Sequence, residues 1–90
     1  MSCVHTEPFD TPGWVEPNPS SKDECTDCHE IGENYWAHLR MCLSCGHVAC
    51  CDSSPRRHAH AHHDQTGHPV MRSFEPGESW RWCYVDERIV

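Results

Sequence analysis

Cysteine and histidine are concentrated in one stretch of this chain, from Cys42 to His68. The stretch contains four of the eight cysteines and six of the nine histidines. It includes a CxxC pair, a double cysteine and a run of histidines. Thiolate and imidazole are the side chains that structural zinc sites use most often. A chain with this stretch is therefore expected to fold around metal, with further ligands supplied from outside it.

The chain has too few large apolar side chains to build a sizeable hydrophobic core. Six Val, two Ile, two Leu and two Phe give 12 of the 90 residues, a fraction typical of disordered chains. The four Trp, two Tyr and many Cys and His argue against disorder. A small domain of this composition needs metal ions or disulfides to stabilise it. We therefore expect one domain over residues 1–90 that depends on such cross-links.

The N-terminal sequence decides between the two kinds of cross-link. MSCVHTEPFD has neither the basic region nor the apolar region of a secretory signal, and no apolar run reaches the length of a membrane span. Paired cysteines in a chain without a route to an oxidising compartment indicate metal ligands rather than disulfides. We expect a cytoplasmic zinc-binding chain that does not contact membranes.

The charge of the chain limits its partners. Fourteen acidic residues against seven basic ones give a formal charge of −7. Nucleic-acid binding gains most of its affinity from Lys and Arg that neutralise phosphates. This balance argues against a nucleic-acid partner. We expect a monomer whose partner is a protein or a peptide tail.

The first half of the chain predicts an irregular segment followed by a hairpin. Residues 1–24 hold four of the seven prolines, which predicts an extended lead-in. Its exception is a Cys3-Val4-His5 clip that offers two metal ligands. Apolar residues alternate over 36–41, the pattern of a half-buried strand, and residues 48–50 are placed to pair back on it.

The second half predicts one helix and two strands. Ser53, Ser54 and Pro55 indicate a helix start, so we expect a helix over about 56–64 that stops near Gly67. Strands over 69–74 and 80–85 flank a turn. The expected fold class is therefore α+β: a short antiparallel sheet, one main helix and zinc sites.

Two CxxC pairs carry the strongest signal. Cys25–Cys28 and Cys42–Cys45 are separated by 13 residues, and each pair aims two thiolates at one point. His58 and His62 are four residues apart on the predicted helix, so they lie one turn apart on the same face. Structural zinc sites of this kind are closed by four protein ligands and leave no position for a substrate. The pattern therefore predicts a protein that is not an enzyme.

The string CxxC…WAHLRMCLSCGHVACCD…HxxxH…TGHPV…SWRWCYVD resembles the UBP-type zinc finger, a family named for ubiquitin-specific proteases. The resemblance covers residues 3–86, and the compact chain is similar to small stand-alone bacterial members. It implies two interleaved zinc sites and a potential third. The first set is Cys25, Cys28, Cys50 and His58. The second set is Cys42, Cys45, His62 and His68. The third set is Cys3, His5, Cys83 and Asp86. Cys50 is favoured over Cys51 by its spacing to Cys45.

In eukaryotic members the resemblance implies a pocket for the free C-terminal Gly-Gly of ubiquitin, lined by aromatic residues and closed by an Arg. Trp82 and Tyr84 match pocket aromatics on the last predicted strand, and Trp36 lies on the first. Asp52 stands near the position of the family Arg, where it would repel a carboxylate. Two main functions stay open, and zinc or redox buffering through thiols such as Cys51 is a third. One is a non-catalytic peptide-binding module walled by Trp36, Trp82 and Tyr84. The other is a structural zinc domain that acts in an assembly through its acidic surface.

Overall fold

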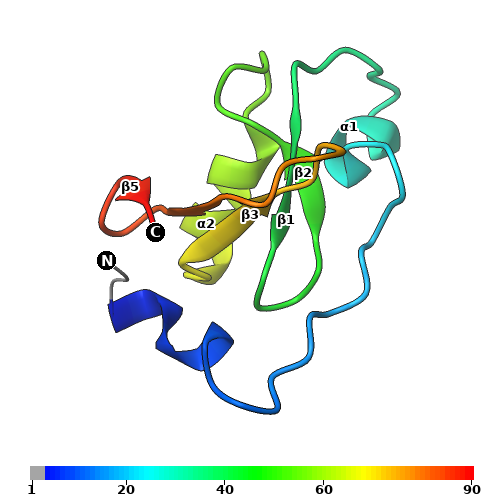
Figure 1. Ribbon diagram of the computed structural model, residues 1–90. Coiled ribbons are helices and arrows are strands. Elements are labelled where there is room, and N and C mark those ends of the chain that lie inside the picture. Colours follow the sequence, from blue (N-terminus) through cyan, green and yellow to red (C-terminus); the bar gives the residue numbers. More distant parts are fainter. Residues whose placement is uncertain (1–3) are drawn as a thin grey trace.

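The computed structural model describes residues 4–90. Its strands form one antiparallel sheet in the order β2-β1-β3-β4-β5 (Figure 1). The strands are β1 (Leu39–Cys42), β2 (Val48–Cys50), β3 (Val70–Ser73), β4 (Arg81–Cys83) and β5 (Arg88–Ile89). The helices are the 3-10 helix η1 (Val4–Phe9) and the α-helices α1 (Thr26–Glu30) and α2 (His58–Thr66). This arrangement confirms the α+β class.

The hairpin of β1 and β2 separates the cysteines of the central stretch. Leu39 lies opposite Cys50 and Met41 opposite Val48, so the second CxxC occupies the connecting turn. Cys50 lies at the other end of the hairpin. β1 begins at Leu39, later than predicted, because residues 36–38 do not pair with a neighbouring strand. The hairpin thus directs Cys42 and Cys50 to two different places.

The C-terminal strands are shorter than predicted and include one that was not predicted. β4 ends at Cys83 and pairs with β3, where Trp82 lies opposite Met71. Glu87 has a φ of 52°, and the chain reverses there to form β5. A two-residue strand carries no alternation pattern, so sequence periodicity could not indicate it.

The buried core is small and rich in cysteine. Met41, Met71, Val48 and Val70 are fully buried and supply its largest apolar side chains. Five of the thirteen members of the buried cluster are cysteines, namely Cys25, Cys28, Cys42, Cys50 and Cys83. Much of the interior is therefore made of potential metal ligands, as expected for a small domain that needs metal ions or disulfides to stabilise it.

α2 begins two residues later than predicted and without a Ser or Asp cap. Arg57, the residue before the helix, is left-handed with a φ of 46° and makes no side-chain cap. The backbone N–H of His58 instead donates to Cys50 Sγ at 3.2 Å. The helix stops as expected at Gly67, whose φ is 76° and whose N–H donates to the carbonyl of His63. The sulfur of Cys50 therefore takes the place of a side-chain cap at the first turn of α2.

The lead-in is more ordered than its proline content predicted. Residues 4–9 form η1, and Phe9 packs edge-on against Trp14 with ring centroids 5.5 Å apart. Two ion pairs attach this segment to the sheet: Arg81 to Asp10 at 2.9 Å and Arg72 to Glu16 at 2.7 Å. These tertiary contacts override the local tendency to extend. Cys3 lies outside the described residues.

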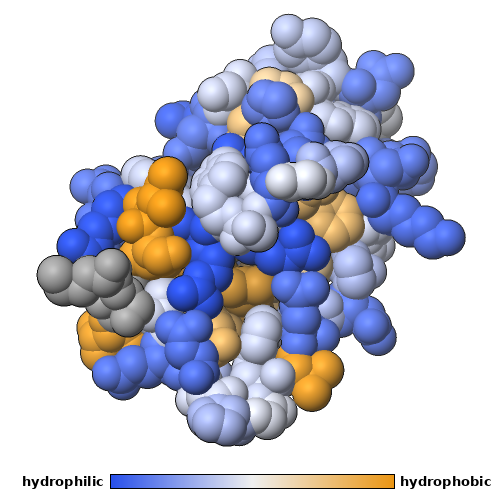
Figure 2. Space-filling model, viewed as in Figure 1, coloured by the Kyte–Doolittle hydropathy of each residue, from blue (hydrophilic) through white to orange (hydrophobic). Residues whose placement is uncertain are grey.

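The face of the molecule drawn in Figure 2 is mainly hydrophilic. Figure 2 shows separate hydrophobic patches on a face that is otherwise polar. Within residues 4–90, no helix combines the length and the hydropathy needed to cross a bilayer.

Candidate metal centres and surface pocket

The first cluster gathers one donor atom each from Cys25, Cys28, Cys50 and His58, all within 4.8 Å of one another. His58 Nδ1 lies 3.4, 3.2 and 3.5 Å from the sulfurs of Cys25, Cys28 and Cys50. Zinc bonds of about 2.3 Å to sulfur and about 2.0 Å to nitrogen place tetrahedral donors about 3.5 Å apart. The three cysteines are fully buried. The donor set and its spacing fit zinc.

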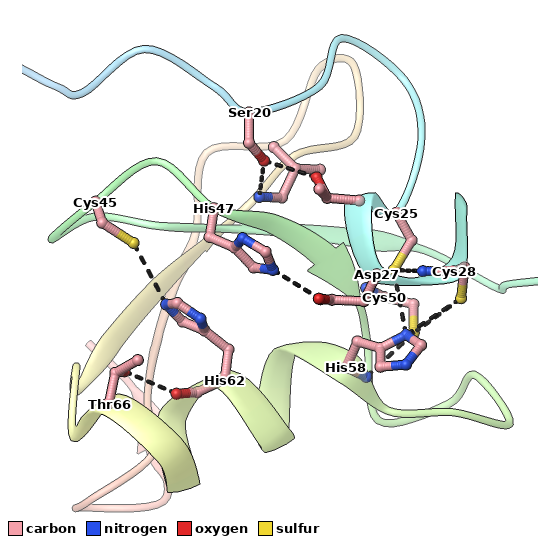
Figure 3. Close-up of polar contacts among 12 residues, drawn as sticks. Ser20, Cys25, Asp27, Cys28, Cys45, His47, Cys50, His58, His62 and Thr66 are labelled. Carbon is pink, nitrogen blue, oxygen red and sulfur yellow. Dashed lines mark hydrogen bonds and ion pairs between the residues drawn. The ribbon is translucent and has the colours of Figure 1, made fainter. Parts of the chain in front are cut away.

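Local backbone geometry prepares this cluster. Cys25 caps α1, and its Sγ accepts from the N–H of Cys28 at 3.4 Å. The N–H of Cys50 also donates to Cys25 Sγ, at 3.2 Å. These two N–H groups hold the Cys25 sulfur in position between α1 and β2. The first CxxC pair, Cys25–Cys28, is called the first knuckle below, and the second pair, Cys42–Cys45, the second knuckle. The first knuckle, the end of β2 and the start of α2 converge on one point (Figure 3).

The second cluster gathers Cys42, Cys45, His62 and His68 under the same 4.8 Å limit. Cys42 Sγ lies 3.4 Å from His68 Nδ1, and Cys45 Sγ lies 3.4 Å from His62 Nε2. Cys42 is buried, whereas Cys45 is exposed. This set of two cysteines and two histidines, called the Cys2His2 site below, also fits zinc. It is more open to solvent than the first set, whose three cysteines and one histidine are called the Cys3His site below.

A third group joins the lead-in to the C-terminal turn. His5 Nδ1 lies 3.5 Å from Asp86 Oδ2 and 3.6 Å from Cys83 Sγ. The fourth residue of the predicted set, Cys3, lies outside the described residues. The three described side chains offer nitrogen, sulfur and oxygen donors, all of which zinc accepts.

Burial shifts the pKa values of Cys28, Cys42 and His62. Burial, and then the neighbouring Cys25, raises the pKa of the Cys28 thiol to about 12. Burial raises the pKa of Cys42 to about 11. A divalent cation reverses this preference because it stabilises thiolates, so binding metal releases protons. Burial, and then His47, lowers the pKa of His62, which favours the neutral imidazole that can bind metal.

Other cysteines and histidines lie outside the clusters. Cys51 Sγ lies 3.6 Å from Ser54 Oγ, and the cluster that could hold a metal includes Cys50 and not Cys51. His47 donates from Nε2 to Asp27 Oδ2 at 2.7 Å. Its ring stacks on His62 with centroids 4.5 Å apart. Sequence reasoning missed this contact, since Asp27 and His47 have no motif that relates them.

A cavity of about 260 Å³ opens on the surface beside the last strands. Trp80, Trp82 and Tyr84 project from alternate positions at and beside β4, as the alternation over 80–85 predicted. The full lining is Arg40, Asp52, Trp80, Trp82, Tyr84 and Ile89. We call this cavity the aromatic pocket.

Trp36 does not line the aromatic pocket, contrary to the prediction. It is partly buried against the hydrophobic core. The prediction extended the strand alternation back to residue 36, but β1 begins only at Leu39. Trp80 lines the pocket instead.

The aromatic pocket contains one side chain of each charge. The guanidinium carbon of Arg40 lies 4.3 Å from the Trp80 ring centroid, and its Nη1 donates to the carbonyl of its neighbour Leu39 at 3.1 Å. Three other arginines of residues 4–90 form ion pairs with carboxylates, whereas Arg40 forms none there. Asp52 lies 3.6 Å from His60 Nδ1.

Tyr84 is held in place by two histidines of α2. Its ring stacks on His63 at 5.1 Å and meets His60 edge-on at 5.3 Å. Burial, and then the Asp52 carboxylate, raises the pKa of the Tyr84 phenol. The pocket therefore presents a neutral hydroxyl at neutral pH, on a ring fixed by the helix that carries the metal ligands.

A sequence profile described as "Zn-finger in ubiquitin-hydrolases and other protein" matches residues 25–90. The chain belongs to the UBP-type zinc-finger family. As a UBP finger it has two Cys/His clusters that can hold zinc, and a third candidate group. The matched region is the finger, not the catalytic domain of the hydrolases that carry it.

Relatives of this UBP finger include much longer proteins. It is 36% identical over 72% of its length to ubiquitin carboxyl-terminal hydrolase 14 of Schizosaccharomyces pombe. It is 40% identical over 81% of its length to ubiquitin carboxyl-terminal hydrolase 44 of Ailuropoda melanoleuca. The matched region is 9% of each of these relatives.

A solved structure of similar size shares the fold of the UBP finger. The solution NMR structure of protein RPA1320 from Rhodopseudomonas palustris superposes with a TM-score of 0.81 at 45% identity. The match covers 99% of this chain and 80% of that one.

Proposed function

We propose that this UBP finger is a non-catalytic module that binds the C-terminal tail of a protein or peptide in the aromatic pocket. The observation that carries the proposal is Arg40, a half-buried guanidinium in a concave, aromatic-lined site with no carboxylate partner in residues 4–90. Ligand sites are typically apolar cavities with a few polar groups that fix orientation. Arg is suited to bind a carboxylate through two parallel hydrogen bonds.

The pocket walls suit the backbone of a tail with small residues. Trp80, Trp82 and Tyr84 are large, stiff side chains that bury apolar area at low entropic cost. Two relatives are named ubiquitin carboxyl-terminal hydrolases. A tail that ends in Gly-Gly with a free carboxylate is therefore the first ligand to test.

Asp52 lowers the expected affinity for such a tail. A carboxylate that lines the same pocket repels an anionic ligand and offsets part of the attraction to Arg40. We therefore expect binding that depends on Arg40 and becomes tighter when Asp52 is neutralised.

Tryptophan fluorescence can test the proposal because two indoles line the pocket. Peptides that end in Gly-Gly, as the free acid and as the amide, are titrated into the zinc-loaded protein. We expect the free acid to bind at least about 10-fold more tightly, the value of one charge-assisted hydrogen bond. Arg40→Gln should remove this preference. Arg88→Gln is the matched control, because Arg88 is an exposed arginine of β5 outside the pocket lining.

Equal affinity for the acid and the amide would overturn the proposal, as would a preference that survives Arg40→Gln. The competing proposal is a structural zinc domain that acts through its surface, supported by the formal charge of −7. It predicts no fluorescence response to either peptide at any concentration.

A further inference from the structure

A side-chain contact joins the two zinc knuckles. Asp27 lies on α1 between Cys25 and Cys28, and His47 follows Cys45 by two residues. His47 Nε2 donates to Asp27 Oδ2 at 2.7 Å (Figure 3). Asp27 is 33% exposed and His47 22%. This hydrogen bond therefore has partial protection from competing water.

The same histidine rests on a ligand of the second cluster. The rings of His47 and His62 are nearly parallel, with an interplanar angle of 10° and centroids 4.5 Å apart. His62 Nε2 points to Cys45 Sγ at 3.4 Å. The stack covers one face of the His62 ring and limits its rotation away from the sulfur.

The surroundings of this contact are open. A cavity of about 150 Å³ lies between the clusters, and Asp27, His47 and His62 are among the side chains that line it. A side chain beside a cavity contacts fewer neighbouring atoms than one in a packed interior, so packing restrains it less. The hydrogen bond and the ring stack therefore carry much of the restraint on the His47 side chain.

We propose that the Asp27–His47 contact couples the two zinc sites. Zinc at the Cys3His site fixes Cys25 and Cys28, and with them the position of Asp27 on α1. Asp27 then holds His47 against His62, with the His62 nitrogen turned to the second site. Zinc at one site therefore raises the affinity of the other, and by linkage the effect is reciprocal.

This connection is separate from the one through α2. The helix carries His58 and His62 and so joins the clusters along one path. Asp27 and His47 close a second path between the knuckles without involving the helix backbone. Loss of a partner that orients a metal ligand typically lowers metal affinity by about 10- to 100-fold. We expect a loss of that size at the Cys2His2 site when the contact is removed.

Asp27→Ala tests the coupling from inside the first knuckle. Glu30→Ala is the matched control, because Glu30 is an exposed carboxylate of the same short helix, outside the lining of the cavity between the clusters. Zinc affinities are measured by competition with a chelator of known strength. Cobalt substitution identifies the sites, because three thiolates give a stronger charge-transfer absorption than two. We expect Asp27→Ala to weaken the Cys2His2 site about 10- to 100-fold, and Glu30→Ala to leave both sites unchanged.

His47→Phe tests the same contact without altering the first knuckle. It keeps an aromatic ring beside His62 and removes the hydrogen bond to Asp27. If both residues act through one contact, the double variant loses no more affinity than Asp27→Ala alone. The proposal is overturned if Asp27→Ala leaves the zinc affinity of the Cys2His2 site unchanged while the first site is filled, or if its effect adds independently to that of His47→Phe.

Discussion

His58 and His62 are one turn apart on α2, yet each belongs to a different Cys/His cluster. The helix has little other support, because Ala59 is its one fully buried residue. An amphipathic helix normally gains its stability from an apolar stripe, and α2 lacks one. The metal sites at its two histidines are therefore expected to replace hydrophobic packing as the anchor of this element.

Zinc removal should unfold the protein. Structural zinc sites contribute about 10–16 kcal/mol each in small peptides at pH 7, whereas whole domains are stable by about 5–15 kcal/mol. The measurement is near-ultraviolet circular dichroism of the four tryptophans during titration with a strong chelator. We expect the signal to collapse as zinc leaves, and to return when zinc is added back. A full signal after proven removal of all zinc would contradict this expectation.

The third group can be tested by counting metal. Asp86→Ala removes the oxygen donor that lies 3.5 Å from His5 Nδ1, and we expect it to lower the zinc content by one equivalent per chain. Asp64→Ala, at an exposed position on α2, is the control. Elemental analysis after exhaustive buffer exchange gives the ratio. An unchanged zinc content would show that Asp86 is not a ligand.

Replacing Gly46, which follows the second CxxC pair, is expected to destabilise the fold. Its φ is 82°, and an added Cβ would overlap the carbonyl oxygen of Asn18. Gly32 has a similar φ of 77° but open space around it. Left-handed strain costs about 1–3 kcal/mol in either variant, so Gly46→Ala should be less stable than Gly32→Ala by the cost of the clash. Thermal midpoints of the zinc-loaded variants make the comparison. Equal midpoints would mean that the Asn18 segment moves away freely.

Tyr84 should make the protein sensitive to alkaline pH. Burial and the Asp52 carboxylate raise the pKa of its phenol above the ordinary value of 10. The unfolded chain therefore loses this proton first as the pH rises. The stability that Tyr84 contributes is complete below pH 10 and is lost above it, up to the folded pKa.

Denaturant titrations on both sides of this pH, for wild type and Tyr84→Phe, measure the effect. Tyr84→Phe should show a smaller decline of stability with pH. Tyrosinate absorbance supplies a second readout, in which Asp52→Asn should lower the Tyr84 pKa and Asp64→Asn should not. A Tyr84 pKa unaffected by Asp52→Asn would show that this carboxylate does not act on the phenol.

The zinc chemistry of the chain was predictable from residue spacing, and much of the pocket was not. Two CxxC pairs and two histidines four residues apart indicate zinc without further information. The division into sets came from the family resemblance, and the structure brings the same side chains together within residues 4–90. Pocket residues depend on where strands begin. β1 starts at Leu39, so Trp36 lies before the strand and does not line the aromatic pocket. Trp80 is among the residues that do line it.

Contacts between distant loops had no sequence signal. Asp27 lies inside the first CxxC pair and His47 follows the second, so the two side chains meet only when folding brings the two pairs together. The first residue of α2 could not be predicted either, because its N–H donates to Cys50 Sγ and not to a Ser or Asp side chain. In both cases the decisive partner is a metal ligand or its neighbour, which propensity rules for helices do not include.

Native mass spectrometry of the folded chain tests most directly whether the protein is built on interleaved zinc sites. Each bound zinc adds a fixed mass, so the number per folded molecule can be counted. We expect at least two zinc ions, one at the Cys3His cluster and one at the Cys2His2 cluster. A chain that keeps its native tryptophan dichroism while holding fewer than two zinc ions would contradict that architecture.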